Sequence, residues 1–230
     1  GMTAQGAANI RNYLVVLHIF LALSFLASIP YTKLRHLVNA PLNILSRKRE
    51  NPGSPEKIDN IEEAEVLGVG DIREFTPRQL LSFDACLNCG RCQDACPATI
   101  SGTAYSPRIL IQSLRQVMVD RLTYPEHSRD MPEETVHEAL GDQSAWDCTT
   151  CGACIERCPA FVNPVEEVID LRRYLALTTG KLPKTISDTL KNLERKGNPW
   201  GMPPEERIIW TEGLDVRELA PGDETDVLLY

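Results

Sequence analysis

The sequence lacks an excess of positive charge. Its 230 residues include 24 Lys and Arg against 32 Asp and Glu, and the formal net charge is −8. A net-acidic chain with no long basic run argues against a nucleic-acid partner. The sequence also shows no phosphate-binding loop and no pairing of a nucleophile with a base. With 43% hydrophobic and 24% charged residues, the composition is that of an ordinary globular protein and argues against wholesale disorder.

Cysteine is missing from most of the chain. All eight cysteines lie in two quartets with the spacing C-x2-C-x2-C-x3-C, and a proline, Pro97 or Pro159, follows each quartet. Eight cysteines could pair as disulfides, but random pairing does not predict two identical quartets. Zinc ribbons combine two Cys-x2-Cys units and lack the run of three followed by a fourth. The observed spacing is that of the bacterial ferredoxins, which bind iron–sulfur clusters.

The ferredoxin spacing predicts which cysteines act together. In two-cluster ferredoxins the fourth cysteine of each quartet ligates the other cluster. We therefore expect two [4Fe-4S] clusters, which we call cluster 1 and cluster 2. The predicted ligands are Cys86, Cys89, Cys92 and Cys158 for cluster 1, and Cys148, Cys151, Cys154 and Cys96 for cluster 2. A cluster held by four thiolates has no open position, so we expect electron transfer and no catalytic residue in this chain.

The first long apolar run is typical of a transmembrane helix. Residues 13–29 carry no charge, and extension back to Ile10 gives 20 residues, or about 30 Å of helix. Basic residues are more frequent after the run than before it, which predicts that the cysteine-rich region lies on the cytoplasmic side of the inner membrane. A secretory signal peptide would have its basic residues before the run. A buried helix of a soluble protein is the other alternative.

Two histidines near this run are candidate metal ligands. His18 and His36 are 18 positions apart, which is five turns, so on a continuous helix both would face the same way, about 27 Å apart. A histidine inside a membrane span is usually functional, and axial ligation of haem b is the obvious role. A hydrogen bond between helices for His18 and an interfacial position for His36 are the alternatives. Pro30 lies between the two histidines. Because a proline can kink a helix, the shared face of His18 and His36 is a hypothesis. His127 and His137 lie among acidic residues, and we expect them to be solvated.

The rest of the pattern predicts a mainly α protein with five segments. We expect a membrane helix and basic flank in residues 1–50, a surface linker in 51–75, and an α-helical two-cluster ferredoxin domain in 76–180. A helix and connector follow in 181–222, and 223–230 would begin a strand of a further domain. Thr76, Ser106 and Asn163, each followed by proline, are expected helix caps. Because the membrane helix and the strand have no partners here, we expect the chain to be part of a longer polypeptide.

The two quartets, separated by a long helical insert, resemble the iron–sulfur domain of the heterodisulfide-reductase and glycolate-oxidase family. The segment LHIFLALSFLASIPYTKLRHLVNAP is similar to the last transmembrane helix of nitrate-reductase-gamma-type cytochromes b. That likeness implies that His18 and His36 each supply one ligand to a b haem. Together these features resemble the membrane-bound electron-transfer-flavoprotein:quinone oxidoreductases of bacteria. The resemblance implies further membrane helices, downstream cysteine-rich domains, a soluble flavoprotein partner and a membrane quinone.

These observations predict a membrane-anchored relay that passes electrons between a soluble flavoprotein and haem or quinone through two [4Fe-4S] clusters. A heterodisulfide-reductase-like subunit of a thiol, disulfide or sulfite-pathway complex is the main alternative. A succinate-dehydrogenase type is disfavoured, because the chain has no third cysteine set for a [2Fe-2S] centre. A zinc-bound structural module is the non-redox alternative, and it would require closed tetrahedral sites.

Overall fold

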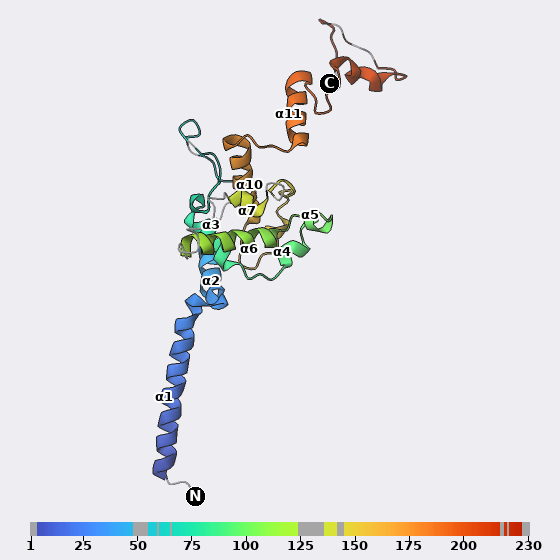
Figure 1. Cartoon of the computed structure of the whole chain (residues 1–230). Coiled ribbons are helices and arrows are strands. Elements are labelled where there is room, and N and C mark those ends of the chain that lie inside the picture. The colour runs from blue at the N-terminus through green and yellow to red at the C-terminus, as the bar shows by residue number, and fades with distance from the viewer. Residues whose placement is uncertain are drawn as a thin grey trace. The chain divides into compact units, whose positions relative to one another are not determined.

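The computed structural model describes residues 4–47, 55–58, 60–64, 66–123, 136–141, 145–216, 219 and 221–226. The chain divides into two compact units, Gly1–Lys181 and Leu182–Tyr230, here called unit 1 and unit 2 (Figure 1). The described part of the chain is mainly helical and contains no β-strand. This confirms the predicted mainly α fold. The strand expected near residues 227–230 lies outside the described residues.

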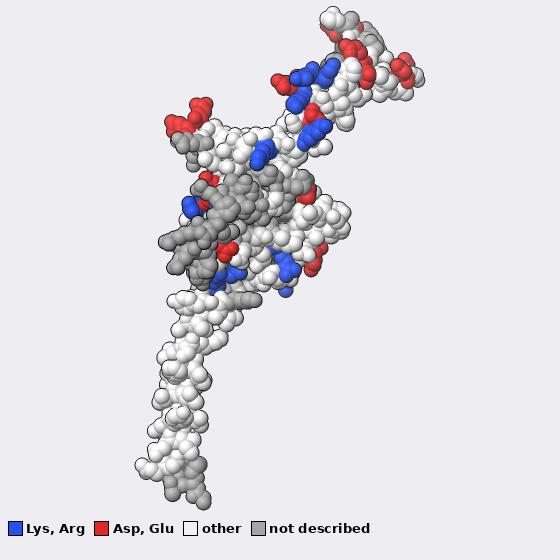
Figure 2. All heavy atoms as spheres, in the orientation of Figure 1, with Lys and Arg blue, Asp and Glu red and all other residues white. Residues whose placement is uncertain are grey.

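Unit 1 begins with a long apolar helix, α1 (Ala4–Ser28), none of whose residues is buried. The span Ala4–Tyr31, with a mean hydropathy of 2.1, is long and apolar enough to cross a membrane. Figure 2 shows mainly uncharged side chains along it. Uncharged side chains that pack against no other part of a protein are suited to contact with lipid.

The helix does not continue to His36. Two short 3-10 turns, η1 (Ile29–Tyr31) and η2 (Lys33–Arg35), separate α1 from α2 (His36–Ser46). Pro30 lies in the first of these turns, and the extended backbone of Thr32 (φ −116°, ψ 175°) lies between them. The expectation that His18 and His36 share one face of a continuous helix is therefore wrong. The physical reason is that proline removes a backbone donor and an extended residue changes the direction of the chain.

Helix α2 packs on the domain that carries the cysteines. It lies against α3 (Pro77–Ala85), with Ala40 and Asn43 buried. The Asn43 side-chain amide donates to the carbonyl oxygen of Ala160 over 2.7 Å. Arg35, just before α2, pairs with Asp84 of α3 at 3.3 Å. Helix α2 is thus part of unit 1 through a buried polar contact as well as apolar packing.

Three helices begin with the same local device. Thr76, Ser106 and Asn163 each accept a hydrogen bond from the backbone of the first turn, and a proline follows each cap. These caps start α3, α6 (Pro107–Met118) and α10 (Pro164–Arg173), as predicted. The proline suits the first helical position because its missing N–H would have no partner there. Helix α10 continues as a π turn, η5 (Tyr174–Thr178), before Gly180 adopts a φ of +67°.

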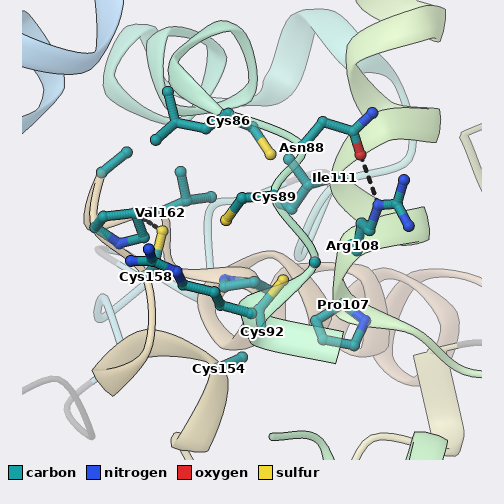
Figure 3. A pocket seen from close by; sticks show the side chains of 16 residues that line it. Cys86, Asn88, Cys89, Cys92, Pro107, Arg108, Ile111, Cys154, Cys158 and Val162 are labelled. Atoms are coloured by element: carbon teal, nitrogen blue, oxygen red, sulfur yellow. Dashed lines mark hydrogen bonds between the residues drawn. The ribbon is translucent and has the colours of Figure 1, made fainter. Parts of the chain in front are cut away.

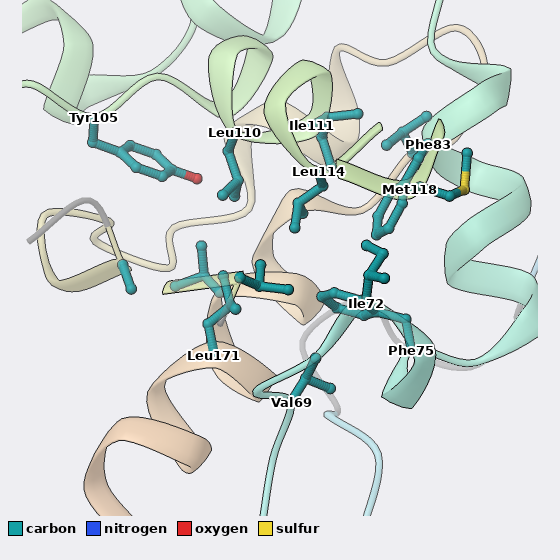
Figure 4. Packing of buried hydrophobic residues seen from close by; sticks show 14 of the residues in the cluster. Val69, Ile72, Phe75, Phe83, Tyr105, Leu110, Ile111, Leu114, Met118 and Leu171 are labelled. Carbon is teal, nitrogen blue, oxygen red and sulfur yellow. The ribbon is translucent and has the colours of Figure 1, made fainter. Parts of the chain in front are cut away.

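The core of unit 1 lies where α3, α6 and α10 meet (Figure 4). Helix α6 buries one face, with Leu114 fully inaccessible and Ile111 1% exposed. Phe83 of α3 meets Phe75 edge to face, with ring centroids 5.2 Å apart. Each such buried side chain contributes about 1.5–3 kcal/mol. This core fixes the helices between which the cysteine loops run.

The remaining described elements of unit 1 are short. They are η3 (Ile72–Glu74), α4 (Arg91–Asp94), α5 (Pro97–Ile100), the π turn η4 (Val119–Thr123), α7 (Val136–Leu140) and α9 (Ala153–Glu156). Unit 2 contains α11 (Lys184–Lys196) and the 3-10 helix η6 (Pro204–Thr211). Helix α11 ends at Gly197 with a φ of +67°, as predicted for a glycine C-cap.

The expectation of a surface linker over residues 51–75 is wrong for its C-terminal part. Val69, Ile72 and Phe75 are buried in the core of unit 1. The backbone reaches α10 closely, because the Val69 N–H donates to the Asp170 carbonyl at 3.1 Å. Gly68, with a φ of +96°, permits this approach: a Cβ there would lie 2.3 Å from the Tyr174 nitrogen. Side-chain composition alone does not show so close an approach of two backbones.

The structure also corrects the environment of His137. This side chain on α7 is 3% exposed, and its Nε2 lies 3.1 Å from the Val69 carbonyl oxygen. Its ring stacks on Tyr174, with centroids 5.1 Å apart. The acidic sequence around His137 suggested solvation, but packing of α7 on α6 buries the ring. His127 lies outside the described residues.

A buried acidic network joins α3 to α10. The Gln79 side-chain amide donates to Glu167 and to Asp170, each over 2.8 Å. Arg78 pairs with both carboxylate oxygens of Glu166 at 2.6–2.7 Å. Burial raises the pKa of Glu167 well above its usual range, and the carboxylates of Glu166 and Asp170 add to this. The neighbouring acids Glu166 and Glu167 therefore differ, because only Glu166 has an arginine paired to it.

We expect the Glu167→Gln variant to be more stable than the parent chain above pH 5. The pKa of Glu167 is higher in the folded chain than its ordinary value of 4.5. The protonated Glu167 side chain therefore stabilises the fold fully at pH values below 4.5. This contribution is lost as the pH rises through the folded pKa. Glutamine keeps the shape and cannot ionise. Thermal unfolding at a series of pH values should show a rise in Tm of roughly 2–4 °C near neutral pH and a flatter pH dependence.

The neighbouring Glu166→Gln variant is the matched control, because it makes the same chemical change one position away. It removes the charge that pairs with Arg78, so its Tm should fall. Equal shifts in the two variants would contradict the interpretation of Glu167 as a buried neutral acid.

Candidate metal centre

The two cysteine quartets form loops of the same shape. In the first loop Asn88 and Gly90 flank Cys89 with φ angles of +53° and +85°. In the second loop Thr150 and Gly152 flank Cys151 with φ angles of +53° and +78°. The glycines precede the short helices α4 and α9 as their N-caps. Their role in tight turns can be read from the sequence, whereas the left-handed Asn88 and Thr150 carry no comparable signal.

The four predicted ligands of cluster 1, which come from both quartets, line one pocket together with Cys154 of the second quartet (Figure 3). Cys86, Cys89 and Cys92 come from the first loop, and Cys158 comes from the end of the second. In Figure 3 their sulfur atoms face a common space. The pocket encloses about 430 Å³ of empty space, including the part open to solvent, and Pro107, Ile111 and Val162 form apolar walls. We call these four cysteines the first cysteine set.

The other four thiols also gather. Burial raises the pKa of Cys154 to about 12, and the neighbouring thiols of Cys148, Cys92, Cys151 and Cys96 add to this. Cys96, from the end of the first quartet, is therefore close to residues of the second. We call Cys148, Cys151, Cys154 and Cys96 the second cysteine set. The fourth cysteine of each quartet thus lies near cysteines of the other quartet, and Cys92 and Cys154 bring the two sets close to each other. The division of the eight cysteines into two ligand sets stays a prediction from their spacing.

The electrostatics of the first set show the same approach. Burial raises the pKa of Cys92 to about 11, with further contributions from Cys86 and Cys158. Burial also raises the pKa of Cys158, and hydrogen bonds from the backbone amides of Val162 and Ala160 partly offset this rise. Thiols of this kind hold their protons at neutral pH unless cations bind them. Binding of iron would displace these protons and remove the repulsion between thiolates.

Backbone amides point at one sulfur of each cysteine set, and both of these sulfurs belong to the second quartet. The Val162 N–H donates to Cys158 Sγ over 3.3 Å, and the Thr150 N–H donates to Cys148 Sγ over 3.4 Å. Amide hydrogen bonds to sulfur are a main way in which proteins tune iron–sulfur clusters. The donor set, eight thiols with amides directed at two of them, therefore fits two iron–sulfur clusters.

A single metal ion suits these residues less well. In the described part of the chain, no group of three or more His, Cys, Asp or Glu side chains is arranged to hold one metal ion. A tetrahedral zinc site needs sulfur atoms about 3.8 Å apart, as zinc–sulfur bonds of about 2.3 Å require. A cluster of four irons and four sulfides is larger and needs more widely spaced thiolates.

The structure does not bring the two candidate haem ligands together. His18 is exposed on α1, and His36 is half-buried at the first position of α2. The break at residues 29–35 separates them.

Residue Arg172 of α10 supports the second cysteine set, and the sequence did not single it out. Its guanidinium donates to the carbonyl oxygens of Ala145, Trp146 and Cys148. It also lies over the Trp146 ring, 5.4 Å from the centroid. These contacts hold the segment that leads into Cys148. An arginine in a basic helix end gives no sequence signal for such a role.

Comparison with known proteins agrees with this geometry. The 4Fe-4S dicluster domain matches residues 79–159. Residues 79–159 therefore carry a 4Fe-4S dicluster domain. It is 33% identical over 240 residues to the EtfAB:quinone oxidoreductase of Syntrophomonas wolfei, covering 93% of this chain and 34% of that protein. It is also 33% identical over 257 residues to the probable iron-sulfur-binding oxidoreductase FadF of Bacillus subtilis, covering 97% of this chain and 36% of that protein.

Other relatives cover less of the chain. A probable membrane-anchored ferredoxin of Chromohalobacter salexigens is 34% identical over 180 residues, 71% of this chain and 27% of that protein. An iron-sulfur subunit of the CoB–CoM heterodisulfide reductase of Methanopyrus kandleri is 32% identical over 110 residues, 48% of this chain and 47% of that protein. The chain spans about a third of the length of the first three relatives. The predicted resemblance is confirmed, and the dicluster family supports two [4Fe-4S] clusters.

We expect the Arg172→Gln variant to lose the iron bound at the second cysteine set faster than the parent chain. The variant removes hydrogen bonds to three carbonyl groups beside Cys148. If the lost hydrogen bonds stabilise the iron-bound loop by about 1.4 kcal/mol, which is the contribution of one to three hydrogen bonds, iron should be released about tenfold faster. Iron release to a chelator, followed by absorbance, measures the rate.

The control for this experiment is Arg173→Gln, one position along the same helix. Arg173 contacts Asp170 and the Glu56 carbonyl and touches no cysteine loop in these contacts. If both variants release iron at the same rate, Arg172 has no specific role at the cysteines.

Proposed function

We propose that this chain is a membrane-anchored electron relay, with two [4Fe-4S] clusters that pass electrons between a soluble partner and the membrane. The observation that carries the proposal is the approach of the fourth cysteine of each quartet to thiols of the other quartet. All-thiolate sets suit iron–sulfur clusters, which exchange one electron at a time.

The first cysteine set would hold cluster 1 and the second cysteine set would hold cluster 2. The chain positions the thiolates, excludes water with apolar walls and directs backbone amides at sulfur. With four thiolates each, neither cluster has a free position for substrate. The role of these residues is therefore electron transfer, and any substrate chemistry would take place elsewhere in the oxidoreductase.

We further propose a soluble flavoprotein and a membrane quinone as redox partners. This rests on the name of the Syntrophomonas relative, which is matched over nearly the whole of this chain. Membrane attachment is supported by the apolar span and by the membrane-anchored ferredoxin among the relatives. The basic residues after the span favour the cytoplasmic side. The proposed ferredoxin domain covers 76–180, and Val69, Ile72 and Phe75 pack into its core.

The haem assignment remains a proposal from the sequence alone. His18 and His36 could each supply one ligand only, because the described chain brings no second ligand to either. The residues present do not by themselves form a haem site, and the proposed relay includes no haem step. A heterodisulfide-reductase-like role is the second candidate function, favoured by the Methanopyrus relative. That match covers only half of the chain.

The relay predicts the metal content of the chain. Purified without oxygen in detergent, it should contain about eight irons per chain and show broad absorbance from iron–sulfur clusters. Metal analysis together with the spectrum measures this. A chain that contains nearly stoichiometric zinc and almost no iron would contradict the proposal.

The exchange of the fourth cysteine can be tested in the same preparation. Alanine replacements of Cys89 and Cys158 should abolish one and the same reduced-cluster signal in electron paramagnetic resonance. Replacements of Cys151 and Cys96 should abolish the other signal. If Cys96→Ala instead removes the signal that Cys89→Ala removes, each quartet binds its own cluster and the crossed assignment is wrong.

A further inference from the structure

A buried hydroxyl group beside the second cysteine set makes no hydrogen bond of ordinary geometry among the described residues. The group is the Tyr105 hydroxyl, whose side chain is 2% exposed and lies at one side of the hydrophobic cluster (Figure 4). The Cys148 thiol is a side-chain hydrogen-bond neighbour of this hydroxyl, and the thiols of Cys154 and Cys96 also act on it electrostatically. A buried hydroxyl without a well-formed hydrogen bond is unfavourable, so Tyr105 points to an acceptor on the sulfur side that the loaded site supplies.

The corresponding position at the first cysteine set is apolar. Tyr105 directly precedes the Ser106 cap and proline of α6, and Val162 directly precedes the Asn163 cap and proline of α10. Val162 lines the pocket of the first cysteine set, as Tyr105 lies beside the second. The two halves of the site are thus alike in backbone, but only one of them has a hydroxyl at this position.

We propose that the Tyr105 hydroxyl donates a hydrogen bond to a thiolate or sulfide sulfur of cluster 2 and thereby raises the reduction potential of that cluster. The inference rests on the proposed function, in that the second cysteine set must hold a cluster. Reduction adds negative charge to the cluster, so a hydrogen-bond donor stabilises the reduced form more than the oxidised form. Tyr105 would act as a tuning residue and would not itself carry electrons.

The test is a redox titration of the detergent-purified, cluster-loaded chain, followed by electron paramagnetic resonance. The alanine variants of Cys89 and Cys151 assign the two signals. In Tyr105→Phe, the ratio of reduced to oxidised cluster 2 at a fixed potential should fall about fivefold or more. A fivefold change corresponds to the loss of one hydrogen bond that contributes about 1 kcal/mol. Cluster 1 should not change. Tyr174→Phe, which removes a hydroxyl from a ring stacked on His137, should leave both clusters unchanged.

A second measurement separates tuning from a packing effect. Reduced cluster 2 should show a coupled exchangeable proton by deuterium exchange and electron–nuclear double resonance, and Tyr105→Phe should lose it. Full iron content with unchanged potentials, or the proton retained in the variant, would overturn the role of Tyr105 and leave the relay intact. Iron content near zero in the parent chain would instead overturn the relay.

A separate observation concerns the order of the two clusters. Helix α2, which follows the apolar span, contacts the elements that carry two residues of the first cysteine set. Helix α2 packs on α3, whose C-cap is Cys86. The Asn43 side-chain amide of α2 donates a hydrogen bond to the carbonyl oxygen of Ala160, which lies two residues after Cys158. Arg47 lies over the Phe161 ring, 4.3 Å from the centroid. Three contacts thus fix α2 to the loops around cluster 1.

The opposite face of α2 is apolar and exposed. Leu37 is 54% exposed, Leu42 47% and Leu45 82%. Along the chain, α2 follows the apolar span after the short break at residues 29–35. A helix with one face on protein and an apolar face outward, placed directly after a membrane span, is suited to lie in the lipid headgroup region.

We infer that α2 rests on the membrane surface and holds cluster 1 nearer to the lipid than cluster 2. On the proposed function, cluster 1 would then exchange electrons with the membrane partner. Cluster 2 would exchange them with the soluble partner. The loop of cluster 2 is instead braced by Arg172 of α10, the helix that leads toward unit 2 along the chain.

This order can be measured with the chain in lipid nanodiscs that contain a gadolinium-chelating lipid. A paramagnetic ion relaxes nearby spins most strongly, so the cluster 1 signal should saturate at higher microwave power than it does with a diamagnetic lanthanum chelate. The cluster 2 signal should change less. An equal or larger effect on cluster 2 would overturn the order. Loss of the relaxation effect from both clusters would contradict the membrane placement of α2, while the iron content still tests the relay separately.

Discussion

The approach of each quartet's fourth cysteine to the other quartet is the constraint on which the rest of unit 1 depends. Cys158 joins thiols of the first loop, and Cys96 joins thiols of the second. These approaches connect segments that are far apart in the chain, so the helices between them must fold back against each other. The core of α3, α6 and α10 provides that folding. Metal binding and core packing therefore support the same arrangement, as is common where a site forms only in the folded chain.

The two halves of the site are built alike but placed in different surroundings. Each loop has two left-handed residues around its second cysteine, and each is followed by a capped helix with proline. The surroundings then differ: α2 contacts one loop and α10 holds the other. A repeated sequence unit thus yields two clusters that can differ in potential and in partner. An electron relay needs such a difference to give its two ends separate roles.

Buried polar groups lie at the contacts between these helices. Gln79 caps its own helix and also donates to two acids of α10, Glu167 and Asp170. Asn43 and Arg172 each hold backbone carbonyls of a cysteine loop. Such contacts are directional, and apolar packing is not, so they fix how each loop lies relative to its supporting helix.

The sequence by itself determined the local features. The cysteine spacing, the caps at Thr76, Ser106 and Asn163, and the apolar run each depend on residues close together in the chain, and the structure has the helices that they predict. Only the tertiary structure decided the features that depend on distant residues. It ended the first helix before His36, buried His137 and the side chains of Val69, Ile72 and Phe75, and brought Arg172 to the cysteine loop. The physical reason is that capping and spacing are set by neighbours within a few residues, whereas burial and hydrogen bonding depend on which elements pack together.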